Sequence, residues 1–137
     1  MSYLGIDFGL KRIGLAMCEN DSYMAFPFIM LENGKDTFSE LKKIIKDKTV
    51  EVIVMGLPLN LSMQESDQSM ITRKFGDALS RESGIKVVYE NEIFSTLEAE
   101  KYIVDSKNRK RDIDKISASL ILQSYLDKVK INFDKIN

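Results

Sequence analysis

The chain has 137 residues, of which 44% are hydrophobic and 30% charged, and its formal net charge is −1, so we expect a single globular domain over residues 1–137. It contains no histidine and one cysteine, Cys18, which excludes His-dependent catalysis, His-ligated zinc and an internal disulfide. No apolar run nears the roughly 20 residues that cross a bilayer, and the first residues do not resemble a signal peptide, so we expect a cytoplasmic protein with no membrane partner.

The first third of the sequence predicts an antiparallel meander. Apolar segments separated by turn residues predict strands at 3–8, 12–18 and 23–31. Pro27 marks the third of these as an edge strand or a bulge. The turns are too short for crossover connections, so consecutive strands should pair antiparallel.

Beyond residue 34 the pattern alternates between helix and strand. We expect helices at 36–48, 65–83, 96–104 and 113–129, and strands at 51–55 and 86–89. Asp36 and Asp112 are candidate N-caps, and Gly84 should end the second helix. A basic loop at 107–111 and the polar tail at 131–137 are expected to be poorly ordered. This order predicts an RNase H-like fold, in which a mixed five-stranded sheet carries helices on both faces.

Three acidic residues stand out in this arrangement. Asp7 lies in a strand that is otherwise apolar, where an unpaired carboxylate is costly unless it is neutralised, hydrogen-bonded or bound to a cation. A purely structural Asp7, bonded to the amides of the Gly9 turn, is the alternative. Glu92 follows the fifth strand and could be an ordinary loop glutamate. Asp114 is expected in the first turn of the last helix, where the macrodipole alone would favour it.

The predicted topology brings these acids together, because the first strand, the exit of the fifth strand and the start of the last helix converge at one end of the sheet. Three carboxylates there would repel by about 4 kcal/mol per pair at about 4 Å and an effective dielectric of about 20. Divalent cations would relieve this repulsion, and oxygen ligands suit Mg²⁺ or Mn²⁺. We therefore predict a two-metal site at Asp7, Glu92 and Asp114 that would cleave a phosphodiester.

Five segments in order resemble a known family. They are GIDFGLKRIGLAMCE at 5–19, GLPLNLS at 56–62, TRKFGDAL at 72–79, NEIFSTLEAE at 91–100 and DIDKISASLILQSYLD at 112–127. Together they resemble the YqgF family of RNase H-like proteins, described as pre-16S rRNA nucleases and as Holliday-junction-resolvase-like proteins. The resemblance covers residues 6–127 and implies that Asp7, Glu92 and Asp114 are the catalytic acids. The arginine that follows the glutamate in the family is Ile93 here, which we expect to affect rate and substrate binding more than the type of reaction.

The resemblance implies a metal-dependent nuclease that acts on structured RNA during 16S rRNA precursor maturation in ribosome biogenesis, with ribosomal subunit precursors as partners. Basic residues would contact the nucleic-acid backbone; the candidates are Lys11, Arg12, Arg73, Lys107, Arg109, Lys110 and Arg111. The run at 107–111 could also be an ordinary solvated loop.

Other functions remain compatible with the sequence. A Holliday junction resolvase would act on branched DNA as a dimer, but no dimer face is evident, so we expect a monomer or a weak homodimer. A noncatalytic RNA-binding assembly factor could keep the fold, and Ile93 in place of arginine favours this somewhat. Actin-like and sugar-kinase ATPases share the I-D-F-G segment, yet they pair two such domains and this chain has room for one.

Overall fold

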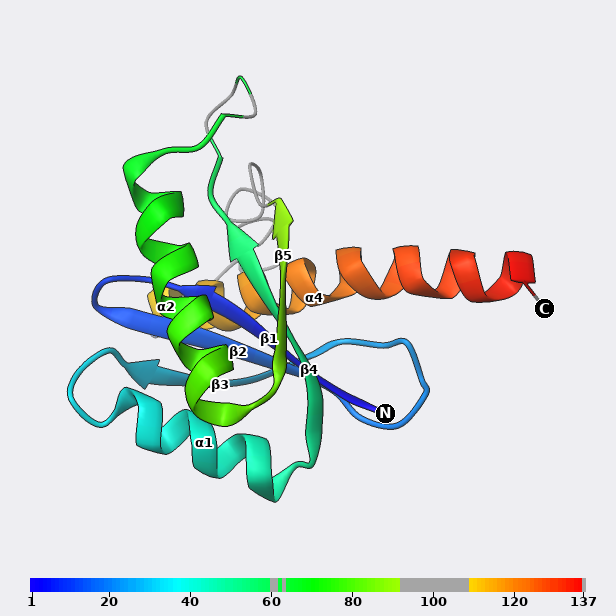
Figure 1. Ribbon diagram of the computed structural model, residues 1–137, viewed down its shortest axis with the longest axis horizontal. Helices are drawn as coiled ribbons and strands as arrows, with labels where there is room; N and C mark the ends of the chain where they lie inside the picture. Colours follow the sequence, from blue (N-terminus) through cyan, green and yellow to red (C-terminus); the bar gives the residue numbers. More distant parts are fainter. Residues whose placement is uncertain (60–61, 63, 92–108, 137) are drawn as a thin grey trace.

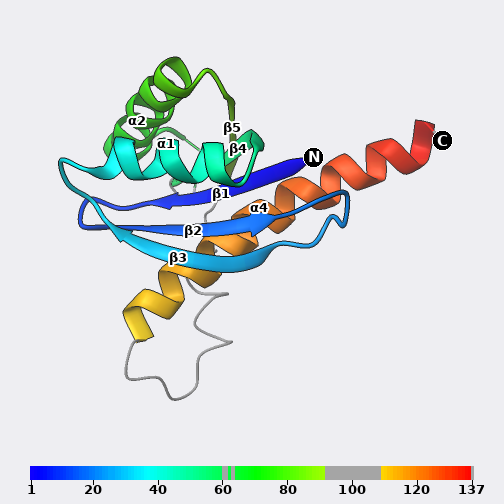
Figure 2. The ribbon, with the colours of Figure 1, turned by 90° about the horizontal axis from the view of Figure 1, so that it is seen from below.

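A mixed five-stranded sheet forms the centre of the molecule. The computed structural model describes residues 1–59, 62, 64–91 and 109–136, with the backbone alone at 109–114 and 136. Among these residues the sheet order is β3-β2-β1-β4-β5. Figures 1 and 2 show α1 and α2 on one face and α4 on the other. The predicted mixed sheet with helices on both faces is therefore confirmed.

The first three strands form the predicted meander. They are β1 (Ser2–Phe8), β2 (Arg12–Cys18) and β3 (Phe26–Glu32), and both neighbouring pairs are antiparallel. β3 begins three residues later than predicted. The side-chain amide of Gln123 accepts from the Ala25 amide and donates to the Tyr23 carbonyl, both at 2.9 Å. These bonds occupy backbone groups that a longer strand would have used.

The middle of the chain alternates as expected. It forms α1 (Thr37–Asp47), β4 (Val50–Leu57), α2 (Asp67–Ser83) and β5 (Lys86–Asn91). β4 pairs parallel with both β1 and β5. Both strands end two residues later than predicted, because Gly56 and Leu57 pair with Glu90 and Asn91. The carboxyl ends of β1, β4 and β5 consequently meet at one edge of the sheet.

The ends of α1 and α2 correct one predicted cap and confirm another. Asp36 makes no side-chain capping bond to α1; the hydroxyl of Thr37 accepts from the Gly34 amide instead. α2 is capped by Ser66, which forms a capping box with Ser69. Gly84 ends α2 with a φ of 74°, the left-handed conformation that favours glycine, as predicted.

The last helix, α4 (Arg109–Ile136), is longer than predicted at both ends. Asp112 lies within it and is no cap, and residues 109–111 are helical although a loop was expected. The tail was also wrongly predicted, because residues 131–136 continue the helix without a glycine or proline to stop it. Figure 1 shows this end of α4 running beyond the sheet. The predicted helix at 96–104 lies outside the described residues.

Apolar side chains on the two faces of the sheet build two cores. Leu4, Ile6 and Met55 face α1 and α2, whereas Tyr3 and Val54 face α4. β1 contributes to both cores, which explains its nearly continuous apolar sequence. None of the described helices is both long and apolar enough to span a bilayer.

Candidate active site

Asp7 lies on the α4 face of the sheet near the end of β1. Alternate residues of a strand point to opposite faces, and Tyr3 belongs to the α4 core whereas Ile6 belongs to the other. Asp7 therefore shares the face of Tyr3 and Gly5. It pairs with Gly14 of β2 and is only partly exposed.

α4 runs antiparallel to β1 across this face. Tyr3 contacts Tyr125, with ring centroids 6.1 Å apart, and two residues further on Gly5 meets Leu122 and Ala118. A step of two strand residues covers about 6.7 Å, which is the rise of four to five helical residues. The next step along β1 consequently brings Asp7 beside the turn of α4 that precedes Ala118.

That turn contains Asp114, so the backbone of the predicted residue lies at the expected end of the sheet. Asp114 occupies the second turn of α4 and not the first, because the helix already begins at Arg109. Its favourable interaction with the helix macrodipole is correspondingly weaker than predicted, since that effect fades beyond the first turn.

Glu92 follows directly after Asn91, the last residue of β5, and lies outside the described residues. The side chain of Asp114 lies outside them as well. Within the described part of the chain, no three acidic, cysteine or histidine side chains gather in a way that could hold a metal ion. At the carboxyl-terminal edge of the sheet, the described residues include the carboxylate of Asp7 as a candidate metal ligand. Its oxygen atoms are ligands of the kind that Mg²⁺ and Mn²⁺ prefer. The three-acid metal site thus stays a prediction.

The predicted basic residues divide between the two faces. Lys11 is exposed in the β1–β2 turn, and Arg12 begins β2 on the same face as Gly14 and hence as Asp7. Arg73 lies on α2, on the opposite face of the sheet. The remaining four are Lys107, which lies outside the described residues, and Arg109, Lys110 and Arg111, whose backbone forms the first turn of α4.

Arg73 already has an anionic partner. Its Nε and Nη2 each lie 2.7 Å from Oε1 of Glu65, just before α2, and its guanidinium lies 5.1 Å from the centre of the Tyr89 ring. The hydrogen bond from Ser69 and then the hydrogen bond from Arg73 hold the pKa of Glu65 below its usual value. No sequence pattern indicates this pair, because its members are eight positions apart and the start of α2 lies between them.

A buried carboxylate at Glu90 was also missed. It is 6% exposed and accepts hydrogen bonds from Lys128, at 2.7 and 2.9 Å, and from Ser124, at 2.8 Å. The available signal was the two-residue period of a strand, which places residue 90 on the same face as Val88. Because Lys128 neutralises Glu90, we interpret this cluster as a clamp between β5 and α4 and not as a metal ligand.

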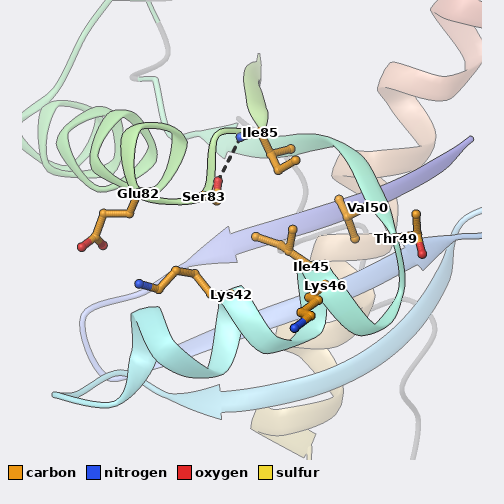
Figure 3. Close-up of a pocket in the computed structure, with 8 residues that line it drawn as sticks. All are labelled: Lys42, Ile45, Lys46, Thr49, Val50, Glu82, Ser83 and Ile85. Carbon is orange, nitrogen blue, oxygen red and sulfur yellow. Dashed lines mark hydrogen bonds between the residues drawn. The ribbon is translucent and has the colours of Figure 1, made fainter.

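One pocket of about 370 Å³ lies between α1 and the turn from α2 to β5 (Figure 3). Lys42 and Lys46 line one side of it, and Glu82 and Ser83 line the other. Val50, the first residue of β4, is at its base, so the pocket is at the end of the sheet opposite Asp7. It contains no residue that the sequence predicts to be functional.

The fold is shared with Holliday junction resolvases. "T. thermophilus RuvC in complex with Holliday junction substrate" superposes with a TM-score of 0.61 at 12% identity, covering 95% of this chain and 96% of that one. The fowlpox virus resolvase bound to Holliday junction DNA superposes with a TM-score of 0.56 at 16% identity, covering 94% and 99%. These matches confirm the predicted RNase H-like fold.

Sequence comparison narrows the class to a family. The chain belongs to the RuvX (YqgF) family, described as "Holliday junction resolvase", whose model matches residues 1–128. A "Putative pre-16S rRNA nuclease" of Sulfurihydrogenibium sp. (strain YO3AOP1) is 35% identical over 98% of this chain and 95% of its own length. A protein of the same description from Lactococcus lactis subsp. lactis (strain IL1403) is 36% identical over 90% and 92%. The resemblance noted in the sequence is confirmed, and these relatives are named as nucleases, which are hydrolases of ester bonds.

Proposed function

We propose that this protein is a metal-dependent nuclease that hydrolyses phosphodiesters of structured RNA, and that its substrate is the 16S rRNA precursor. The observation that carries the proposal is the position of Asp7 on β1, at the edge where β1, β4 and β5 end and beside the turn of α4 that contains Asp114. In the sequence, Glu92 directly follows Asn91, the last residue of β5. Membership of a family with relatives named as pre-16S rRNA nucleases supports the choice of substrate.

Asp7, Glu92 and Asp114 would hold two Mg²⁺ or Mn²⁺ ions. When bound, such ions lower the pKa of water and stabilise the charge on the leaving oxygen. The absence of histidine from the chain fits an oxygen-only ligand set. Lys11 and Arg12, which follow Asp7 in the next turn and strand, would hold flanking phosphates.

The domain extent, cellular location and partners that we propose follow from this function. The nuclease domain would span residues 1–137 and act in the cytoplasm on ribosomal subunit precursors as a monomer or weak homodimer. The basic residues of the first turn of α4, together with Lys107, would contact the RNA backbone, and each contact would add to the salt dependence of binding.

Single-turnover cleavage tests the proposal directly. A labelled 16S rRNA precursor and a labelled four-way DNA junction are each incubated with the protein in Mg²⁺ or Mn²⁺. We expect the RNA to be cut, and Asp7→Asn to slow cutting by more than about 100-fold, the upper range for loss of an outer-shell partner of a metal ligand. Asp47→Asn, which removes an exposed charge at the end of α1, is the matched control and should cut at the wild-type rate.

A second candidate is resolution of branched DNA, the activity that the description of the family model names. Cleavage of the junction but not of the RNA, abolished by Asp7→Asn, would establish it in place of the first. If neither substrate is cut, a noncatalytic assembly factor becomes the better assignment. Thermal melts separate this last case, because a functional metal site raises the melting temperature in excess Mn²⁺ for the wild type and less for Asp7→Asn.

A further inference from the structure

Arg73 lies on α2, where its side chain contacts both Tyr89 and Glu65. Its guanidinium lies over the ring of Tyr89, a geometry in which the flat cationic group is attracted to the π face. The hydroxyl of Tyr89 lies 2.7 Å from Oδ1 of Asp77 and 3.1 Å from the Arg73 carbonyl oxygen. Burial, followed by the hydrogen bond to Asp77, raises the pKa of Tyr89, so the phenol stays a neutral donor.

Gly76 is required for this arrangement. A Cβ at this position would stand 2.4 Å from the Tyr89 hydroxyl oxygen and 2.8 Å from the sulfur of Met55. α2 can therefore lie close enough to the sheet for Tyr89 to support the Arg73 side chain. While the guanidinium carbon lies 5.1 Å from the centre of the Tyr89 ring, the Nε–Nη2 edge is the part that contacts Glu65.

The contact with Glu65 has the form of a phosphate contact. An arginine edge binds carboxylate and phosphate oxygens with the same two donors, and planar stacking of the guanidinium is typical of nucleic-acid recognition. Both side chains of the pair are 44% exposed, and exposed ion pairs contribute little to stability. Glu65 can consequently exchange with an external anion by giving up its contact with Arg73 and its hydrogen bond from the Ser69 hydroxyl.

The pair also lies at the level of the proposed active site along the sheet. Tyr89 pairs with Met55, which pairs with Ile6, the residue before Asp7. Asp7 and Tyr89 face opposite sides, so a nucleic-acid strand that crosses the carboxyl-terminal edge of the sheet could contact both. Ser66, next to Glu65, donates to the carbonyl of Pro58 at 2.9 Å, which holds the start of α2 at this edge.

We propose that Glu65 occupies a phosphate subsite made by Arg73 and Tyr89, and that a phosphate of the RNA displaces it on binding. Glu65 is then an internal competitor that weakens binding, and Arg73 is a binding residue outside the metal site. This inference rests on the proposed action on RNA but not on the identity of the metal ligands.

Equilibrium binding of a fluorescein-labelled RNA hairpin with a single-stranded extension tests this, in EDTA so that no cleavage occurs. We expect Glu65→Gln to bind about twofold to fivefold more tightly than the wild type. Glu82→Gln changes the net charge equally at the other, exposed end of α2 and should have a smaller effect, because salt screens distant charges. Arg73→Gln should weaken binding and lower the slope of log K against log salt by about 0.7–0.9.

The double variant Glu65→Gln with Arg73→Gln shows whether the tighter RNA binding of Glu65→Gln depends on Arg73. On the Arg73→Gln background, Glu65→Gln should tighten binding no more than Glu82→Gln does. An equal gain on both backgrounds, or no gain over Glu82→Gln on the wild-type background, overturns the inference. Either result would leave the proposed nuclease function intact if cleavage still depends on Asp7. Failure of the phosphate subsite can therefore be distinguished from failure of the nuclease function.

Discussion

Gly5 of β1 lies directly beneath Leu122 of α4, so closely that a Cβ on Gly5 would stand 2.8 Å from the Cβ of Leu122. The same Cβ would be 2.9 Å from the carbonyl oxygen of Ala118, a backbone atom that no rotamer change can move. This contact sets the height of α4 above the sheet, and α4 carries Asp114 to the neighbourhood of Asp7.

Gly5→Ala should therefore force α4 away from β1. We expect it to lower the free energy of unfolding by about 1–3 kcal/mol, the usual cost of overpacking, and to reduce nuclease activity in protein that is still folded. Urea unfolding and single-turnover cleavage measure the two effects. Gly34→Ala is the control, because no atom lies within 4 Å of the added Cβ, and it should change neither. Wild-type stability of Gly5→Ala would contradict the close contact.

Replacing Lys128 should weaken the clamp between β5 and α4. Among the described residues, Lys128→Met leaves the buried carboxylate of Glu90 with the Ser124 hydroxyl as its side-chain donor, so we expect a loss of about 1–2 kcal/mol in the free energy of unfolding. The loss is moderated because the Lys128 side chain is 65% exposed and its charge is partly screened. Lys130→Met, two residues along the same helix, should be nearly neutral. Equal effects of the two substitutions would argue against the clamp.

Tyr89 should make stability fall at high pH. The unfolded chain ionises near the usual tyrosine value of about 10, whereas the pKa in the folded protein is raised by burial and by Asp77. The stabilisation by the neutral phenol is thus complete below pH of about 10 and is lost as the pH rises from there towards the raised pKa. Wild type should exceed Tyr89→Phe in stability by about 0.5–1.5 kcal/mol at neutral pH, with the difference narrowing above pH of about 10 in urea titrations. A constant difference would contradict the raised pKa.

Ser117 offers a stabilising substitution. Its hydroxyl is fully buried, and within the described part of the chain it is a buried side-chain oxygen without a hydrogen-bond partner. Ser117→Ala should raise the free energy of unfolding by about 1 kcal/mol, because it removes an unsatisfied polar group. Ser119→Ala should instead be neutral or slightly destabilising, since Ser119 donates to the Ile116 carbonyl at 2.7 Å. If Ser117→Ala is the more destabilising of the two, the hydroxyl has a hydrogen-bond partner beyond the described residues, such as an ordered water.

Local pattern was sufficient for the strands and for the cap at Gly84. Apolar runs and turn residues are read from neighbours in sequence, and β2 occupies 12–18 as predicted. The ends of β4 and β5 were placed too early, because Gly56 and Glu90 are not strand formers by composition and join the sheet only through pairing. The carboxyl-terminal end of α4 was placed too early because the mostly polar residues at 131–136 resemble a disordered tail. No glycine or proline among them ends the helix, and it continues to Ile136.

For the candidate site, the sequence by itself determined that Asp7 lies in a largely buried strand and that any catalysis by this chain proceeds without histidine. It also determined the order of strands and helices, from which we predict that Asp7, Glu92 and Asp114 converge at one edge of the sheet. Only the tertiary structure decided which face Asp7 occupies, how closely α4 passes over Gly5, and that Arg73 lies on the opposite face against Glu65. Strand alternation and apolar periodicity are local properties of the chain, whereas these contacts depend on the packing of helices against the sheet, which joins residues far apart in sequence.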